Sequence, residues 1–321
     1  MNDLSRRQFG QLVLAGLPLS MLLDKINSNV NGVQIGAITY SFRALPTEDV
    51  LKAYTTIGLG EMELMSNHCE ALAGAPSGRG GGGGSGRRGQ PMTPEQQAAR
   101  DAAVKALADF RKNATEATFK PVRKRIEDMG VELKLLCYNM SDLRTLPDGR
   151  TTGTTDDDIE YGFMMAKGLG VDTISTSTQV SMAKRIAPFA EKHKIRVGFH
   201  GHANTQDPNE VATPGSFEAV MAASKYHGAN LDIGHYTEAG YDPVAFIQNN
   251  HARITNLHLK DKKTAAHGGQ NGPWGTGDTP IKACLKLLQK NKWDVPANIE
   301  FEYEGDPVTE VAKCLQLCKE Y

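Results

Sequence analysis

Residues 228–263 read GANLDIGHYTEAGYDPVAFIQNNHARITNLHLKDKK, and this stretch carries the pattern that decides the fold. It contains one short apolar run at residues 229–235 and a second at residues 254–261. A helical stretch of mixed polarity separates the two runs. Two strands joined by a helix in this way predict a parallel βαβ unit.

The same alternation extends over residues 33–321, where helical segments separate apolar runs of strand length. Eight such runs lie at residues 33–42, 60–66, 131–139, 171–176, 195–200, 229–235, 254–261 and 297–303. Eight βα units predict an α/β protein with a single-domain (β/α)8 TIM barrel. A doubly wound open sheet is the alternative fold, but no GxGxxG or Walker A pattern opens any unit.

The composition fits a globular protein with a full hydrophobic core. The chain has 321 residues, and a barrel of this kind needs about 250. Hydrophobic residues make up 40 % and charged residues 23 %, as expected for a protein with a full core. The formal net charge of −1 gives no field that favours nucleic acid or an anionic membrane. We therefore expect no nucleic acid partner and no membrane contact beyond an export signal; a homo-oligomer stays open.

The first 32 residues resemble an export signal and linker rather than part of the barrel. The stretch MNDLSRRQFG contains a twin-arginine pattern at residues 5–9, and the apolar run QLVLAGLPLSMLL follows it. This run is shorter than the roughly 20 residues of a membrane span. We predict a periplasmic protein exported by the twin-arginine route. No clear Ala-x-Ala cleavage site precedes Gly32, so the cleavage site stays open.

Residues 73–92 interrupt the barrel pattern after its second strand. This segment is rich in glycine and arginine and has almost no apolar side chains. Such a composition cannot bury enough surface to order itself, so we predict a flexible loop within the barrel domain of residues 33–321.

Polar side chains gather where the predicted strands end, which is where barrels of this kind carry their active sites. The run RVGFHGHANT, residues 196–205, ends one strand at His200 and has His202 just beyond. The other strand ends contribute Glu63, Asp232, His235, His258, Lys260, Glu300 and Glu302.

Carboxylates brought together in a barrel mouth cost several kcal/mol each unless a cation compensates them. We therefore predict one divalent metal ion, held by His200, Asp232, His258 and Glu300. Imidazole and carboxylate ligands together suit Mn²⁺, our first expectation, with Co²⁺, Fe²⁺ or Zn²⁺ as alternatives.

The stretch 228–263 closely resembles the sugar phosphate isomerase/epimerase family, the xylose isomerase-like barrels. The motifs that carry the resemblance are Asp-x-x-His at residues 232–235, His-x-Lys-Asp at 258–261, GTGD at 275–278 and the glutamate of NIEFEYEG at 298–305. The early segments GAITYSFR and MELMS are also similar to the family's first two strands. The resemblance spans about residues 33–305.

This resemblance implies a metal-dependent sugar isomerase or epimerase. Such enzymes remove a proton next to a carbonyl group and pass through a metal-stabilised enediolate. Asp232, His258 and Glu300 match the metal ligands of the family, His235 matches a substrate contact, and Glu302 is a rival of Glu300 for the ligand role. We expect catalytic roles for Glu300, His200 and Lys260, and substrate binding by Glu63, His202, His235 and Glu302.

The chain departs from the epimerase pattern at His200. Epimerases of this family have a glutamate at that strand end, one of two catalytic carboxylates. One-base reactions therefore stay open, and the second hypothesis is a metal-dependent lyase or dehydratase that eliminates from a keto-sugar or glycoside. Lys260, His202 or His235 is the candidate for a second proton transfer. An abasic-site DNA nuclease and a non-catalytic sugar-binding protein are two further alternatives.

Overall fold

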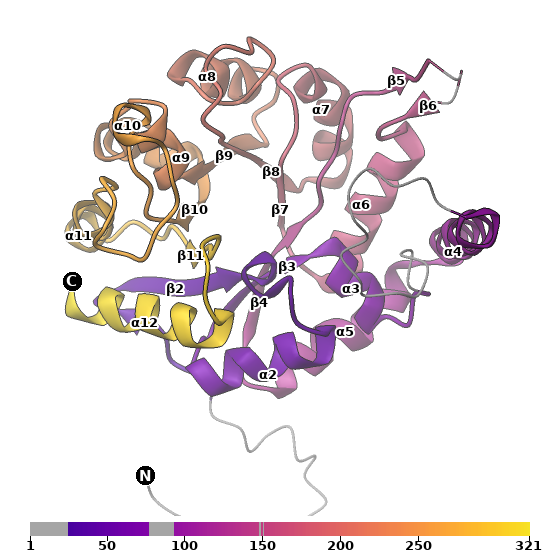
Figure 1. Cartoon of the computed structure of the whole chain (residues 1–321), viewed down its shortest axis with the longest axis horizontal. Helices are drawn as coiled ribbons and strands as arrows, with labels where there is room; N and C mark the ends of the chain where they lie inside the picture. Colours follow the sequence, from indigo (N-terminus) through magenta and orange to yellow (C-terminus); the bar gives the residue numbers. More distant parts are fainter. Residues whose placement is uncertain (1–24, 77–92, 148, 150) are drawn as a thin grey trace, which may run out of the picture.

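The computed structural model of the protein is an α/β barrel (Figure 1). It describes residues 25–76, 93–147, 149 and 151–321. Eight parallel strands close into a wall in the order β2-β11-β10-β9-β8-β7-β4-β3, and β3 pairs again with β2. The predicted single-domain (β/α)8 barrel is confirmed. The twin-arginine segment and residues 77–92 of the predicted loop lie outside the described residues.

The barrel strands coincide with the eight apolar runs of the sequence. They are β2 (Val33–Ile38), β3 (Glu61–Met65), β4 (Glu132–Cys137), β7 (Thr173–Thr176), β8 (Arg196–His200), β9 (His227–Asp232), β10 (Ile254–Leu259) and β11 (Ala297–Ile299).

Six of these strands (β2, β3, β4, β9, β10 and β11) end one to four residues before the corresponding apolar runs do. The run 229–235 ends as a strand at Asp232, because the Asp232 side chain accepts a hydrogen bond from the His235 backbone N–H (2.8 Å) and so caps a helix. Strand β11 ends at Ile299, although the Glu300 N–H still donates to the Leu259 carbonyl (3.0 Å). The site residues His235, Glu300 and Glu302 therefore lie on the segments that follow these strands.

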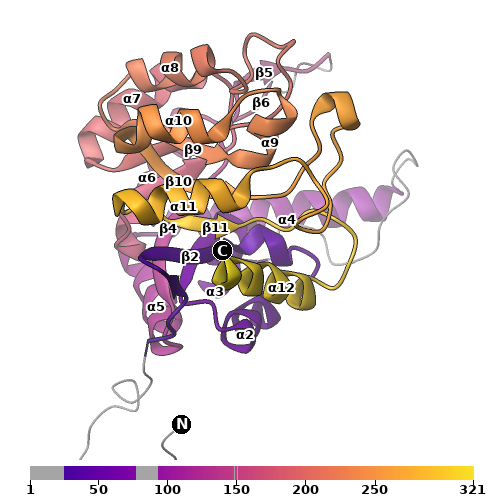
Figure 2. The same cartoon turned by 90° about the vertical axis from the view of Figure 1, so that its left-hand side faces the viewer.

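Helices cover the outside of the wall (Figures 1 and 2). They are α2 (Thr47–Ile57), α3 (Ser66–Leu72), α4 (Pro94–Asn113), α5 (Glu116–Asp128), α6 (Asp156–Leu169), α7 (Met182–His193), α8 (Pro214–Ala222), α9 (Ile233–Glu238), α10 (Pro243–Asn250), α11 (Ile281–Asn291) and α12 (Pro307–Glu320). Short 3₁₀ turns lie at η2 (Thr39–Phe42), η3 (His251–Arg253) and η4 (Ala265–His267), and a small hairpin is formed by β5 (Arg144–Thr145) and β6 (Thr151–Thr152).

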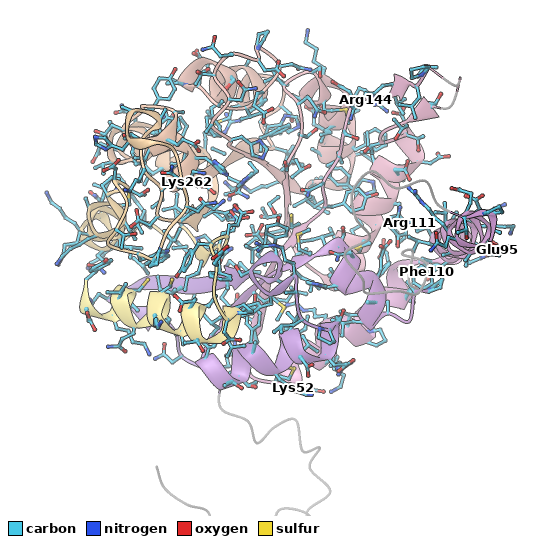
Figure 3. The ribbon with its side chains drawn as sticks, viewed as in Figure 1. Lys52, Glu95, Phe110, Arg111, Arg144 and Lys262 are labelled. Atoms are coloured by element: carbon cyan, nitrogen blue, oxygen red, sulfur yellow. The ribbon has the colours of Figure 1, made fainter. Side chains whose placement is uncertain are left out.

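Helix α4 lies outside the ring of the other helices (Figures 1 and 3). None of its residues is buried. Its connection to the barrel is ionic: Arg111 Nε lies 2.7 Å from Glu70 Oε1, and the Tyr161 hydroxyl donates to the same oxygen (3.0 Å).

The strands bury apolar side chains outward and polar side chains inward. On β10, Leu257 and Leu259 belong to the hydrophobic core, whereas the alternating residues Asn256 and His258 bond to Glu63 across the barrel. The interior is narrow: a Cβ atom on Gly198 of β8 would lie 2.1 Å from the side-chain oxygen of Thr255. The barrel interior is therefore a packed polar layer beneath the strand ends.

A short strand precedes the predicted start of the barrel at residue 33. Strand β1 (Asn29–Val30) pairs antiparallel with β2. Across the part of the chain that the structure describes, no helix is long and apolar enough to cross a membrane. The export route, the periplasmic location and the cleavage site remain predictions.

Candidate active site

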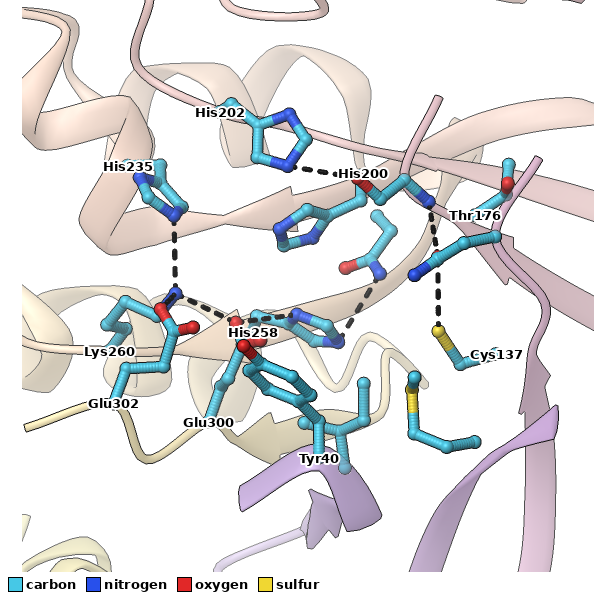
Figure 4. Close-up of a pocket in the computed structure, with 15 residues that line it drawn as sticks. Tyr40, Cys137, Thr176, His200, His202, His235, His258, Lys260, Glu300 and Glu302 are labelled. Carbon is cyan, nitrogen blue, oxygen red and sulfur yellow. Dashed lines mark hydrogen bonds and ion pairs between the residues drawn. The ribbon is translucent and has the colours of Figure 1, made fainter. Parts of the chain in front are cut away.

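A pocket of about 220 Å³ opens at the carboxyl ends of the barrel strands (Figure 4). The predicted side chains that line it are His200, His202, His235, His258, Lys260, Glu300 and Glu302. Tyr40, Asn139 and Ser177 also line the pocket and were not predicted. Tyr40 lies on the 3₁₀ turn η2 after β2, and Asn139 and Ser177 lie on loops after β4 and β7.

The four predicted metal ligands come together; His200, His258 and Glu300 line the pocket, whereas Asp232 is fully buried and is not among the lining residues. His200, Asp232, His258 and Glu300 each offer one ligand atom, and these atoms all lie within 4.8 Å of one another. Strand register explains part of the convergence, since β9 and β10 pair His258 directly with Asp232. All four residues are buried, so water does not screen their lone pairs.

The donor atoms of these residues fit a divalent cation. His200 Nδ1 is buried and has no hydrogen-bond partner among the described residues. Burial, with His258 and His202 nearby, lowers the pKa of His200 well below its usual value, so its imidazole is neutral and able to bind a metal. Asp232 Oδ2 is buried and accepts no hydrogen bond from the described residues, and it lies 3.0 Å from Lys260 Nζ as an ion pair.

Glu63 lies beneath the pocket rather than on its wall. Its carboxylate is fully buried and accepts hydrogen bonds from His258 Nε2 (2.9 Å), Asn256 Nδ2 (3.0 Å) and Asn298 Nδ2 (2.8 Å), all on Oε2. The Ser175 hydroxyl donates to its other oxygen. This position differs from the substrate contact expected from the sequence, because Glu63 is not among the pocket-lining residues.

The Glu63 contact orients His258. Burial lowers the pKa of His258, but the attraction of Glu63 and Glu300 outweighs it, and the pKa is raised well above its usual value. His258 Nδ1 lies 3.1 Å from Glu300 Oε2. A metal-binding histidine commonly donates its other ring N–H to a carboxylate, which fixes its tautomer. The arrangement around His258 matches that pattern, with Nε2 directed at Glu63 and Nδ1 at the ligand cluster.

The Lys260 ammonium lies among three carboxylates. Its Nζ is 3.0 Å from Asp232 Oδ2, 3.0 Å from Glu300 Oε2 and 2.7 Å from Glu302 Oε2. Burial lowers the pKa of Lys260, but these carboxylates outweigh burial and hold it above its usual value. For Glu300, burial favours the neutral acid, yet Lys260 and His258 keep its pKa well below normal. Lys260 is therefore a cation and Glu300 an anion in the same small volume.

The rim of the pocket carries two further histidines, each with a carboxylate partner. His235 Nδ1 lies 3.3 Å from Glu238 Oε2, and its Nε2 lies 3.3 Å from Lys260 Nζ. His202 Nε2 lies 3.1 Å from the Ser177 hydroxyl, and its Nδ1 contacts Glu210 Oε1. The sequence did not indicate Glu210, because it lies on a loop eight residues away from its partner.

The loops after β10 are held by a buried carboxylate. Asp261, the last residue of the His-x-Lys-Asp motif, accepts hydrogen bonds from the Gly275 N–H (2.7 Å) and the Gly277 N–H (2.9 Å). These two glycines belong to the GTGD turn at residues 275–278. The two motifs therefore form one structural unit that fixes the chain beside Lys260.

The comparisons with known proteins agree with this fold. Residues 97–321 match the sequence family described as "Xylose isomerase-like TIM barrel". No curated protein gives a significant sequence match to the chain.

Three solved structures with low sequence identity share the fold. The probable 3-DHS dehydratase AsbF of Bacillus anthracis is 15 % identical with a TM-score of 0.61, over 89 % of this chain and 98 % of that one. The 3-keto-D-glucoside 4-epimerase YcjR of E. coli is 12 % identical with a TM-score of 0.58, over 90 % of this chain and 100 % of that one. A sugar phosphate isomerase/epimerase of Parabacteroides distasonis is 16 % identical with a TM-score of 0.55, over 94 % and 98 %.

Proposed function

The chain belongs to the xylose isomerase-like TIM barrel family, and from that premise we propose that it is a divalent-metal-dependent isomerase or epimerase of a carbohydrate. The observation that carries this proposal is the convergence of His200, Asp232, His258 and Glu300 at one pocket. Two of their donor atoms, His200 Nδ1 and Asp232 Oδ2, are buried and accept no hydrogen bond from any residue that the structure describes. A divalent cation is the ligand that such a donor set suits.

A metal ion held by these four residues would supply Lewis-acid stabilisation where negative charge develops on a substrate carbonyl oxygen. The side chains supply the proton chemistry. The Glu300 carboxylate is kept ionised by Lys260 and His258, so it is ready to accept a proton from the carbon next to that carbonyl. The Lys260 ammonium, 3.0 Å from Glu300, is ready to donate a hydrogen bond or a proton to a substrate oxygen.

The size of the pocket favours one sugar unit as the substrate. Its volume of about 220 Å³ is below the roughly 300–1,000 Å³ of sites for drug-sized ligands. Its polar lining of histidine, amide and hydroxyl groups suits the many hydroxyls of a sugar. We propose a free sugar or keto-sugar, or the sugar end of a glycoside.

A metal-dependent lyase or dehydratase is the second candidate, and one observation favours it. Both carboxylates that line the pocket, Glu300 and Glu302, come from the segment after β11. The end of β8, where epimerases of the family carry a glutamate, has His200 instead. One carboxylate base is enough for β-elimination, whereas inversion at a carbon needs a group on each face.

Two measurements test the proposal. Metal analysis of purified protein should find about one divalent ion per chain, and an Asp232→Asn variant should lose it; unchanged metal content in that variant contradicts the ligand assignment. Assays with Mn²⁺ on free ketohexoses and on methyl 3-keto-D-glucoside should give an isomer or epimer. An unsaturated product that absorbs in the ultraviolet would instead identify the lyase.

A further inference from the structure

The carboxylates that line the pocket lie on one side of it, and a histidine lies on the opposite side. In Figure 4, Glu300, Glu302 and Tyr40 lie below the pocket, and His202 lies above it. An epimerisation needs proton transfer at both faces of one carbon, so a group above the pocket is required if Glu300 acts from below. His202 is the candidate that the view shows, since its ring faces the pocket beside His200, with ring centroids 4.8 Å apart.

His202 lies between a carboxylate and a hydroxyl. Its Nδ1 contacts Glu210 Oε1 within ion-pair range. Its Nε2 lies 3.1 Å from the Ser177 hydroxyl, which lines the pocket. The His202 side chain is 30 % exposed and that of Glu210 is 24 % exposed, so the pair is partly desolvated but reachable from the pocket.

The position of Glu210 is fixed by contacts between two loops. Glu210 forms an antiparallel bridge with Gln179, which joins the loop after β8 to the loop after β7. Next to it, the Asn209 carbonyl accepts from the Val180 N–H (2.8 Å), and the Asn209 side chain accepts from the Ser181 N–H (2.9 Å). A carboxylate on such a braced segment can hold an imidazole in one orientation.

The same loops hold the other two members of the group. The His202 N–H donates to the Val211 carbonyl (2.8 Å), and the Ser177 N–H donates to the Asn139 side chain (2.9 Å). Carboxylate, imidazole and hydroxyl thus follow one another from the outer loop into the pocket. A carboxylate next to one ring nitrogen favours a proton on that nitrogen and leaves the other, here Nε2 beside the Ser177 hydroxyl, as a proton acceptor. This is the logic of base-oriented histidines in enzymes.

We propose that His202, oriented by Glu210, is the second proton-transfer group of the site and acts on the face of the substrate opposite Glu300. This inference rests on the proposed isomerase or epimerase function. Glu210 is a positioning residue, because it contacts the imidazole and does not line the pocket.

The proton transfer uses one unprotonated and one protonated group. The unprotonated group of the pair, Glu300 or His202 Nε2, takes the proton from the carbon next to the carbonyl. The electrons of that C–H bond form a C=C bond, and the carbonyl π electrons move to the oxygen. The other group, protonated, delivers its proton to the opposite face, which forms the new C–H bond and restores the carbonyl. Proton exchange with water then resets both groups.

Variants of His202 and Glu210 separate this role from a structural one. With methyl 3-keto-D-glucoside in D₂O, followed by proton NMR, the wild type should both exchange the carbon-bound hydrogen and invert the carbon. His202→Gln should keep exchange through Glu300 but lose inversion by at least about 100-fold. Glu210→Gln should lower kcat by about tenfold or more with KM little changed. Both variants should retain the metal content and melting temperature of the wild type.

Glu160→Gln is the matched control. It removes a carboxylate that contacts another histidine, His193 (3.0 Å), between α6 and α7 and away from the pocket. Its kcat should equal that of the wild type. The inference is overturned if His202→Gln inverts at the wild-type rate, or if it loses exchange and inversion equally.

A spectroscopic measurement tests the inference independently of turnover. In ¹⁵N NMR, His202 of the wild type should carry its proton on Nδ1, next to Glu210, and Glu210→Gln should shift this tautomer preference. A proton found on Nε2 in the wild type overturns the role of Glu210. A wild type with the Nδ1 tautomer that acts on none of the sugars contradicts the proposed function and leaves the orientation of His202 supported.

Discussion

Replacing Glu63 by glutamine should weaken metal binding without changing any metal ligand. Glu63 is fully buried, and its Oε2 accepts three hydrogen bonds, one of them from His258 Nε2 at 2.9 Å. Glutamine has nearly the same shape, and its oxygen can take the position of Oε2. Its NH₂ group then faces the Ser175 hydroxyl, which can rotate from donor to acceptor. The substitution therefore removes mainly the negative charge behind His258.

The size of the effect follows from the type of hydrogen bond lost. A hydrogen bond to a charged group contributes about 1.5–3 kcal/mol, and a neutral one about 0.5–1.5 kcal/mol. The difference of roughly 1–2 kcal/mol corresponds to a 5- to 30-fold weaker Kd for Mn²⁺. This agrees with the ~10- to 100-fold losses seen when the outer carboxylate partner of a metal-binding histidine is replaced. Calorimetric titration of the metal-free wild type and of Glu63→Gln with Mn²⁺ measures the two Kd values.

A second buried glutamate on the same strand provides the control. Glu61 also lies on β3, two residues from Glu63, but burial raises its pKa to about 8 and its Oε1 has no hydrogen-bond partner. At pH 7 this side chain is mostly a neutral acid, so Glu61→Gln changes little. The reasoning is refuted if Glu63→Gln binds Mn²⁺ as tightly as the wild type, or if Glu61→Gln weakens binding equally.

Two further predictions concern stability. The folded chain holds the Glu61 proton up to about pH 8, whereas the unfolded chain releases it near pH 4.5. As pH rises between these values, the unfolding free energy of the wild type should therefore fall relative to that of Glu61→Gln, by on the order of 5 kcal/mol. Urea denaturation of both proteins at pH 5 and pH 8 measures this change, and a difference that stays constant contradicts the raised pKa of Glu61. Gly198→Ala should destabilise the barrel by about 1–3 kcal/mol, because the new Cβ would lie 2.1 Å from the Thr255 hydroxyl. In the control Gly240→Ala the new Cβ has no neighbouring atom within 4 Å, so this variant should show only the cost of its positive φ (86°). Equal melting temperatures for the wild type and Gly198→Ala would show that the barrel interior has room for the extra methyl group.

The strand positions and the metal-ligand cluster were predictable from the sequence because both depend on local pattern. Parallel strands of a barrel bring their carboxyl ends to one face, so polar residues at matching strand ends had to converge. His200, Asp232, His258 and Glu300 are such residues, and they meet within 4.8 Å. The prediction of a metal site depended on finding four such residues on neighbouring strands, and no single one of them would have been enough.

The partners of those residues could not be predicted in the same way. Glu63 was expected at the substrate, but its bonds to Asn256 and Asn298 connect positions 193 and 235 residues apart in the chain. Whether a strand residue faces the pocket or the layer below depends on the stagger of strands around the barrel, which the alternation of side chains does not reveal. Glu210 lies on an irregular loop, where no periodicity indicates its direction.

The two glutamates of β3 show how the inner polar layer becomes a site. Both side chains are buried in the same barrel, yet four donors converge on Glu63, whereas Oε1 of Glu61 has none. The donors that reach Glu63 come from β7, β10 and β11, the last two being strands that also lead to the predicted metal ligands. A buried carboxylate without partners destabilises the fold, whereas one with four partners costs little and fixes its neighbours in place. The apolar outer face of these strands therefore stabilises the barrel, and the polar inner face orients His258 in the wall of the pocket.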